Sequence, residues 1–295
     1  MLLVDAHYGA APVPASKLKM QLRLAEHLNK AGGVDDSAVV QLIDFVTRGM
    51  KLAEDKGATE IMAFATSAVR EATNGEQVLK RVHDETGLEI AVLSGEDEAR
   101  MTFLAVRRWF GWSSGRILGF DIGGGSLELA SGTDEEPDVA VSVPLGAGRL
   151  TRTFLHGDPP STESVREARR FARAAIAEVA GRLRRVGEPR VAVATSKTFR
   201  QLARIAGAAS SSEGDYVRRV LRLDDVHELV PRLSAMTAAQ RSKIPGVSEG
   251  RSEQMLAGAV VAEAAMELLE VEELVICPWA LREGIILRRL DGLLR

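Results

Sequence analysis

The chain has 295 residues, of which 45% are hydrophobic and 27% are charged, a composition that supports a folded core and excludes intrinsic disorder. Its net charge of −3 argues against a general binder of nucleic acids or membrane surfaces, and no apolar run reaches the ~18–20 residues of a membrane span. The single cysteine, Cys277, excludes an intrachain disulfide and a cysteine-based zinc site. Because the N-terminus also lacks the basic region of a signal peptide, we expect a cytoplasmic protein, and the length favours two domains.

The first part of the chain is expected to alternate short strands with amphipathic helices. Residues 17–24 alternate basic or polar with apolar side chains, which predicts a half-buried strand. Apolar residues at helical spacing after Asp35 predict a helix that ends at Gly57, and residues 61–65 form a short apolar run that predicts a buried strand. The next elements expected are a helix through Val78, Leu79 and Val82 that ends before Gly87, a strand at 88–93 and a helix at 96–110.

A glycine-rich hairpin is expected next. Residues 116–122 and 127–130 are both strand-like and are joined by Gly-Gly-Gly-Ser, which predicts a strand–turn–strand unit. Because strands and helices interleave through the chain, the predicted fold class is α/β. The sequence Ala-Thr-Ser ends a predicted strand twice, at 65–67 and at 194–196, which indicates two similar halves. The remaining predicted strands are 139–143, 191–194 and 274–276, and the remaining helices begin near residues 146, 162, 196, 224, 254 and 280.

The hairpin from Asp121 to Glu128 has the composition of an anion site. Three consecutive glycines allow positive φ and place no Cβ in the way, so backbone N–H groups can converge on a phosphate. Asp121 and Glu128 flank the loop, and carboxylates beside phosphates are the usual ligands of Mg²⁺. A plain tight turn with incidental acids is the alternative interpretation. The segment lacks the lysine of a P-loop and no helix follows it directly, so P-loop and Rossmann motifs fit poorly.

Two further segments carry polar groups that suit such a site. Residues 96–98 (Glu-Asp-Glu) begin a predicted helix, where one carboxylate could activate a water or all three could simply stabilise the helix N-terminus. Thr66, Ser67 and Arg70 lie at a strand end, a common place for ligands in open α/β sheets, with a helix cap as the alternative. The arginine-rich residues 166–204 are either a solvated helix face or a track for a long polyanion.

These motifs together resemble a known family. The chain resembles the Ppx/GppA family of exopolyphosphatases and guanosine pentaphosphate phosphohydrolases, within the superfamily of actin-like ATPases and sugar kinases. Within that family it looks most like the short actinobacterial exopolyphosphatases. The matching segments follow the family's order over nearly the whole chain and are residues 65–70, 94–100, 121–128, 144–150, 255–260 and 281–284.

The resemblance implies an α/β fold of two actin-like (ribonuclease-H-like) domains, each a mixed sheet flanked by helices, with the active site in the interdomain cleft. Residues 1–115 with a C-terminal helix at 282–295 would form the N-terminal domain, and residues 116–281 the C-terminal one. The family opens with a strand and a first phosphate loop, Asp-x-Gly-Ser-Asn, which no segment of this chain matches. We therefore expect this strand and loop to be missing, either because the chain begins late or because the protein is an impaired relative.

The resemblance also implies an activity. This is hydrolysis of the terminal phosphoanhydride of inorganic polyphosphate, and of guanosine pentaphosphate as a second substrate, with Mg²⁺ or another divalent cation. Glu98 matches the catalytic carboxylate that activates water, and Asp121 and Glu128 match the metal-associated acids. The residues expected to bind phosphate or substrate are Thr66, Ser67, Arg70, Gly123, Gly124, Gly125, Ser126, Gly146 and Gly258.

Two alternative functions stay open. Without the first phosphate loop, the protein could be a non-catalytic sensor of polyphosphate or of the stringent-response nucleotides guanosine penta- and tetraphosphate. A kinase of the same superfamily would transfer the γ-phosphate of ATP to an acceptor, but the motif at 94–100 argues for hydrolysis. No nucleic-acid or membrane partner is expected. A homodimer would extend a basic groove, although no segment marks an interface.

Overall fold

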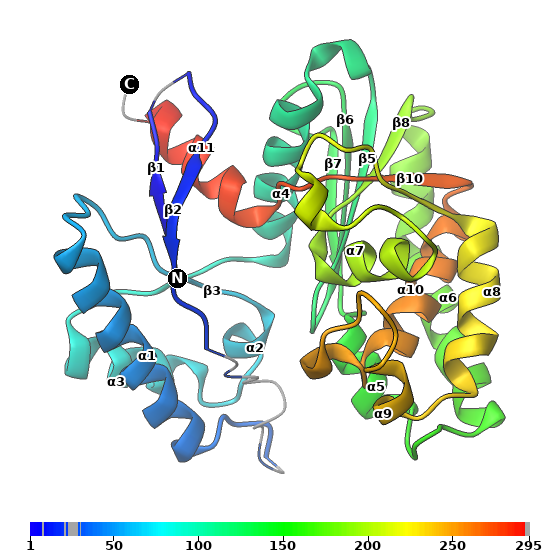
Figure 1. Ribbon diagram of the computed structural model, residues 1–295, viewed down its shortest axis with the longest axis horizontal. Helices are drawn as coiled ribbons and strands as arrows, with labels where there is room; N and C mark the ends of the chain where they lie inside the picture. Colours follow the sequence, from blue (N-terminus) through cyan, green and yellow to red (C-terminus); the bar gives the residue numbers. More distant parts are fainter. Residues whose placement is uncertain (8, 21, 23–28, 30, 293–295) are drawn as a thin grey trace. The chain divides into compact units, whose positions relative to one another are not determined.

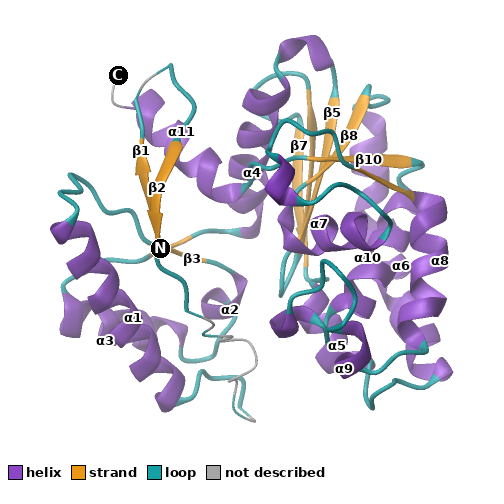
Figure 2. Ribbon diagram, in the orientation of Figure 1, coloured by secondary structure: helices purple, strands orange, loops and turns teal. Residues whose placement is uncertain are grey.

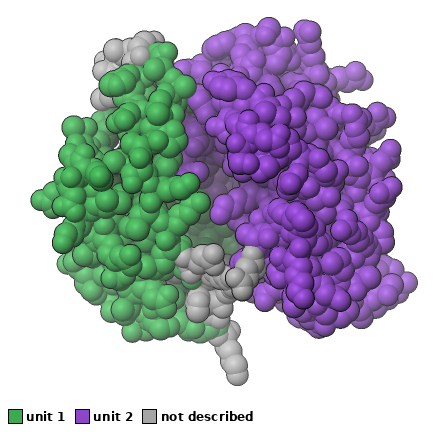
Figure 3. Space-filling model, in the orientation of Figure 1, with its two compact units in different colours: residues 1–94, 286–295 green, residues 95–285 purple. Residues whose placement is uncertain are grey.

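The computed structural model describes the whole chain except residues 8, 21, 23–28, 30 and 293–295 (Figure 1). Helices and strands interleave along it, which agrees with the predicted α/β class (Figure 2). The chain divides into two compact units, residues 1–94 with 286–295 and residues 95–285 (Figure 3). We call them unit 1 and unit 2.

The first boundary between the units lies before helix α4 (Gly95–Phe110), whereas the sequence predicted a boundary after residue 115. Helix α4 packs on strands β6 (Leu127–Gly132) and β7 (Val139–Val143), so it belongs with the sheet that follows it in the chain. Helix α11 (Leu281–Gly292) is shared, because its residues from Ile286 onward belong to unit 1 and the earlier ones to unit 2.

Unit 2 is built on one mixed sheet of six strands in the order β7-β6-β5-β8-β10-β9. Strands β5, β6 and β7 form an antiparallel meander, and β8 and β10 continue the sheet parallel to β5. The edge strand β9 pairs antiparallel with β10 and was not predicted, since only three residues form it. The strands introduced here are β5 (Ile117–Ile122), β8 (Val191–Ala194), β9 (Val220–Arg222) and β10 (Glu273–Ile276).

The two faces of this sheet are covered by different helices. Leu118, Phe120 and Ile122 belong to the large core formed with helices α5 to α8 and α10, whereas Ile117 belongs to a smaller core with α4. Because side chains alternate along a strand, Asp121 lies on the α4 face together with Ile117. The helices that form the larger core are α5 (Ala147–Phe154), α6 (Thr162–Arg185), α7 (Ser196–Ile205), α8 (Leu223–Ser234) and α10 (Met255–Leu268). The short helix α9 (Ala238–Arg241) was not predicted.

Helix α10 is the central helix of unit 2. Residues 255–266 are all buried, because small and apolar residues cover every side of the helix and α5, α6, α7 and α8 pack around it. It is nevertheless only 14 residues long. Among the residues that the structure describes, no helix combines the length and the apolarity needed to cross a membrane.

Unit 1 has its own core between helices α1 (Asp36–Asp55) and α3 (Gly75–Thr86). Val39 and Val46 of α1 meet Val78 and Val82 of α3, which confirms the predicted apolar faces of both helices. Helix α3 ends as predicted at Gly87, which adopts the left-handed conformation (φ 74°) that glycine tolerates best. A single turn of helix, α2 (Ser67–Arg70), precedes α3.

The strands of unit 1 differ from their predictions. They form two separate two-stranded sheets, β1–β2 and β3–β4, rather than one mixed sheet. The strand predicted at 17–24 is wrong for residues 18–20 and 22, because the pairing of β1 with β2 ends where Lys17 lies opposite Leu2. Residues 21, 23 and 24 of that prediction lie outside the described residues. The run 61–65 is not buried, because β3 pairs only with β4 in the described residues and Phe64 stays 38% exposed. The strands are β1 (Leu2–Asp5), β2 (Val13–Lys17), β3 (Phe64–Ala65) and β4 (Ala91–Val92).

Candidate active site

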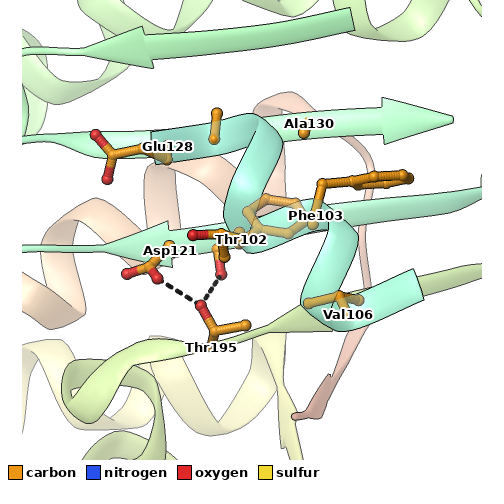
Figure 4. Close-up of a pocket in the computed structure, with 10 residues that line it drawn as sticks. Thr102, Phe103, Val106, Asp121, Glu128, Ala130 and Thr195 are labelled. Carbon is orange, nitrogen blue, oxygen red and sulfur yellow. Dashed lines mark hydrogen bonds between the residues drawn. The ribbon is translucent and has the colours of Figure 1, made fainter. Parts of the chain in front are cut away.

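The two acids that flank the glycine hairpin are direct neighbours in the sheet. The register of β5 and β6 places Asp121 opposite Glu128, and side chains of directly opposed residues lie on the same face. In Figure 4 the two carboxylates extend in the same direction from neighbouring strands, beside α4. The hairpin predicted from the sequence therefore places the two acids side by side on one face of the sheet.

Glu98 is the acid of residues 96–98 that joins this pair. Glu96 and Asp97 are exposed, and Glu96 forms an ion pair of 2.6 Å with Arg100. Glu98 is only 7% exposed, in the first turn of α4, and its charge contributes to the raised pKa of Glu128. The structure thus separates Glu98 from its two neighbours, which fit the simple role of acids at a helix N-terminus.

Glu128 is buried among other acids and hydroxyl groups. It is 6% exposed, and the Ser142 hydroxyl donates to its Oε1 at 2.8 Å. Burial first, and then the charges of Asp121 and Glu98, raise the pKa of Glu128 to about 8. The Ser126 hydroxyl donates a hydrogen bond to Glu128, and its expected contact with phosphate stays a prediction.

Asp121 is held by a buried threonine. The Thr195 hydroxyl donates to Asp121 Oδ2 at 2.6 Å (Figure 4). Burial raises the pKa of Asp121, while this hydrogen bond and the charges of Arg200 and Arg251 act in the opposite direction. Hard carboxylate oxygens that repel one another in a poorly solvated place fit a divalent cation such as Mg²⁺, which would relieve that repulsion.

The raised pKa of Glu128 predicts how the metal-free protein responds to pH. A carboxyl group with a folded pKa near 8 and an ordinary value of 4.5 in the unfolded chain binds more protons when folded, so its contribution to stability falls as pH rises between those values. We expect the melting temperature in EDTA to fall between pH 6 and pH 8, and Glu128→Gln to lessen that fall. Thermal unfolding followed by circular dichroism measures both, and equal slopes for the two proteins contradict the prediction.

The glycine loop is held by its carbonyl groups. The carbonyls of Gly123 and Gly124 accept hydrogen bonds from the backbone of Ala147 at 3.0 Å and Arg149 at 2.9 Å, and the Gly125 carbonyl accepts one from Arg149 Nε at 2.8 Å. The Gly123 N–H donates to the Ser126 carbonyl at 2.9 Å, so the loop can offer an anion only the N–H groups that follow Gly123. Gly123 and Gly124 do not use the positive φ that glycine allows, because both have φ outside the left-handed region.

Gly146 allows the start of helix α5 to approach the glycine loop closely. A Cβ atom at this position would lie 2.4 Å from the Gly124 carbonyl carbon and from the Gly125 nitrogen. Gly258 is different, since it is buried inside α10, where a Cβ would lie 2.4 Å from the Thr198 methyl group. Gly258 therefore allows helices α10 and α7 to pack closely, and its expected contact with substrate stays a prediction.

Two arginines near Asp121 were not predicted. Arg251 ends the 3₁₀ helix η4 (Glu249–Arg251), donates to Thr198 Oγ1 at 3.2 Å, and has its pKa lowered by burial against an opposing effect of Asp121. Arg200 on α7 donates to the Pro278 carbonyl at 2.8 Å and its charge acts on Asp121. Arg251 follows an irregular loop, so neither periodicity nor a motif could have indicated it.

The remaining predicted residues lie in unit 1. Thr66 follows β3, Ser67 and Arg70 begin and end α2, and all three are half-buried. Arg70 donates to the Leu93 carbonyl at 2.6 Å and so connects α2 to the end of β4. The Thr66 side chain forms no cap on α2, so the helix-cap alternative is not supported for it. The structure brings Glu98, Asp121, Glu128 and the hairpin together in unit 2, and Thr66, Ser67 and Arg70 together in unit 1.

Comparisons with known proteins find the same family by profile and by sequence identity. A sequence profile of the Ppx/GppA phosphatase family matches residues 3–293. Exopolyphosphatase 1 of Mycobacterium tuberculosis is 53% identical over 292 residues, which cover 99% of this chain and 85% of that protein. Exopolyphosphatase 1 of Mycobacterium leprae is 50% identical over 292 residues, with 99% of this chain and 86% of that protein covered.

Solved structures confirm the fold. An exopolyphosphatase from Cytophaga hutchinsonii superposes with a TM-score of 0.87 at 22% identity, over 99% of this chain and 94% of that one. A Ppx/GppA family member from Aquifex aeolicus gives a TM-score of 0.82 at 23% identity, over 100% of this chain and 94% of that one. The predicted α/β fold and the family resemblance are therefore confirmed.

Proposed function

Because the chain belongs to the Ppx/GppA phosphatase family, we propose that it is an exopolyphosphatase that releases terminal phosphate from inorganic polyphosphate. The observation that carries the proposal is the group of three acids, the buried Glu98 and Glu128 with the half-buried Asp121, beside a glycine loop that can offer N–H groups to phosphate. The names of the mycobacterial relatives, at 50–53% identity, support the same activity.

The three acids have different proposed tasks. Glu98 would accept a proton from a water molecule as the water oxygen attacks the terminal phosphorus. The bond from that phosphorus to the bridging oxygen then breaks, which yields inorganic phosphate and a chain shorter by one phosphate. Asp121 and Glu128 would hold Mg²⁺, which when bound neutralises charge on the phosphate oxygens.

Neighbouring groups support this arrangement. The backbone N–H groups of residues 124–126 would bind the terminal phosphate, while the Gly123 N–H closes the turn by donating to the Ser126 carbonyl at 2.9 Å, and Gly146 keeps the hairpin in place. Arg251 would add positive charge beside Asp121. Thr66, Ser67 and Arg70 of unit 1 are proposed substrate contacts from the sequence alone.

Guanosine pentaphosphate ends in the same phosphoanhydride, so we propose it as a second substrate to test, which would connect the protein to the stringent response. The cytoplasmic location, the homodimer and the domain limits of 1–115 with 282–295 and 116–281 remain predictions from the sequence. A non-catalytic sensor stays the alternative, and turnover distinguishes it from an enzyme.

Metal removal tests the proposal directly. We expect the purified chain to release phosphate from polyphosphate, to lose this activity in EDTA, and to regain it when Mg²⁺ is added back in excess. Asp121→Asn should lower the rate by about 10²-fold or more, because it removes a charged metal ligand. A malachite-green phosphate assay measures all of these rates. Tight polyphosphate binding without turnover, at saturating Mg²⁺, would instead identify a sensor.

A further inference from the structure

The threonine of the repeated Ala-Thr-Ser segment has the same backbone conformation in both units. Thr66 has φ −119° and ψ −157°, and Thr195 has φ −113° and ψ −156°. Each follows a strand and precedes a helix, and neither side chain caps that helix. Threonine at this position usually accepts a hydrogen bond from the helix backbone. The hydroxyl group of Thr195 is therefore available for another task.

In unit 2 that task is a hydrogen bond to Asp121. Thr195 is completely buried, its N–H donates to the Phe120 carbonyl at 2.8 Å, and its Oγ1 lies 2.6 Å from Asp121 Oδ2. The parallel pairing of Phe120 with Ala194 places the two strand ends side by side. The position of the hydroxyl is thus set by the sheet rather than by a mobile loop.

The residue after Thr195 reinforces this placement. Ser196 has φ 68°, which is uncommon for a residue other than glycine, and it lets the chain turn from β8 into α7 directly after Thr195. The Ser196 hydroxyl accepts a hydrogen bond from the Phe199 N–H at 3.4 Å, so Ser196 contributes the contact with the helix start that Thr195 does not make. Unusual backbone of this kind is retained where the surroundings fix it.

The Asp121 side chain borders a small cavity. A small cavity of about 10 Å³ lies on the α4 side of the sheet, with Thr102, Thr195, Asp121 and Glu128 among its lining residues (Figure 4). Gly119 and Ala130 form part of its wall and are too small to fill it. The cavity has room for about one water molecule, and the hydrogen bond from Thr195 gives the Asp121 carboxylate an orientation that these small wall residues do not impose.

We propose that Thr195 is a positioning residue, whose hydroxyl fixes Oδ2 of Asp121 and so presents Oδ1 to the divalent cation. The inference rests on the proposed function, because it takes Asp121 as a metal ligand. Groups that hydrogen-bond to a metal ligand typically change metal affinity 10–100-fold when they are removed.

The test measures binding of Mn²⁺ alone, without substrate, by electron paramagnetic resonance. Thr195→Val keeps the shape of the side chain and removes the hydroxyl, and we expect its Kd for Mn²⁺ to rise about 10–100-fold. Thr195→Ser keeps the hydroxyl, and we expect a Kd within about threefold of the wild type. Thr86→Val is the matched control, because Thr86 uses its hydroxyl on the Val82 carbonyl in unit 1. Wild-type affinity in Thr195→Val, or equal losses in the valine and serine variants, overturns the proposal.

Two further variants keep the result decisive. If Thr195→Val does not fold, Thr195→Cys replaces it, since cysteine has the size of serine but is a weak donor. A Kd for Thr195→Cys equal to that of Thr195→Ser then overturns the proposal. Asp121→Asn distinguishes the metal-binding role of Asp121 from the positioning role of Thr195. Unchanged Mn²⁺ binding in Asp121→Asn refutes the metal role of Asp121 itself, whereas weakened binding there with normal binding in Thr195→Val refutes only the role of Thr195.

Discussion

Replacing Glu98 with glutamine should lower the rate of phosphate release from polyphosphate by about 10²–10⁴-fold, the usual contribution of a general base. Glutamine has the shape of glutamate and can still orient a water molecule, but it cannot accept the proton. Glu98 is the buried residue in the first turn of α4, near Glu128, so a substitution of the same shape keeps the helix and its packing on the sheet. Single-turnover phosphate release at saturating Mg²⁺ measures the effect on the chemical step.

Glu96 supplies the matched control for Glu98. It lies in the same turn of α4, but it is exposed and paired with Arg100. Glu96→Gln should therefore change the rate by less than about twofold, since surface ion pairs contribute little. Equal rates for Glu98→Gln and the wild type, under conditions where Glu96→Gln is also normal, would show that another group activates the water.

The hairpin could be predicted from the sequence because its signal is local. Two strand-like segments are joined by Gly-Gly-Gly-Ser, which marks the turn. Ile122 and Leu127 on either side of these four residues pair, so the next pair outward is Asp121 and Glu128. The role of Glu98 required more than spacing, because residues 96–98 are all acids. Only the packing of α4 on β6 and β7 shows which of the three is buried.

The features that were missed depend on contacts between distant segments. Arg251 and Thr195 both act near Asp121, yet they lie more than 70 residues from it in the chain. The close packing of Gly258 against the Thr198 methyl group likewise could not be read from the motif that contains this glycine. Alternation of side chains at 17–24 predicted a strand without information on where a partner strand ends. A local sequence pattern contains no information on such contacts between distant segments.

Gly146 tests whether the position of the glycine hairpin controls the reaction. In Gly146→Ala the new Cβ would overlap the backbone of Gly124 and Gly125, and backbone cannot rotate away as a flexible side chain does. The hairpin must move by roughly 1 Å, a displacement that can cost about 10²-fold in rate. The overlap should also lower the free energy of unfolding by about 1–3 kcal/mol. Urea unfolding and phosphate release measure the two effects separately.

Two other glycines distinguish a displaced hairpin from a general loss of stability. Gly181 is exposed in α6 and has open space around its Cβ position, so Gly181→Ala should raise the free energy of unfolding by about 0.5–1 kcal/mol and leave the rate unchanged. Gly124 also has open space, but it belongs to the loop that is proposed to bind phosphate. Gly124→Ala should therefore keep the wild-type stability and weaken polyphosphate binding. If Gly146→Ala loses stability but keeps its full rate, the hairpin tolerates displacement and the phosphate must be held elsewhere.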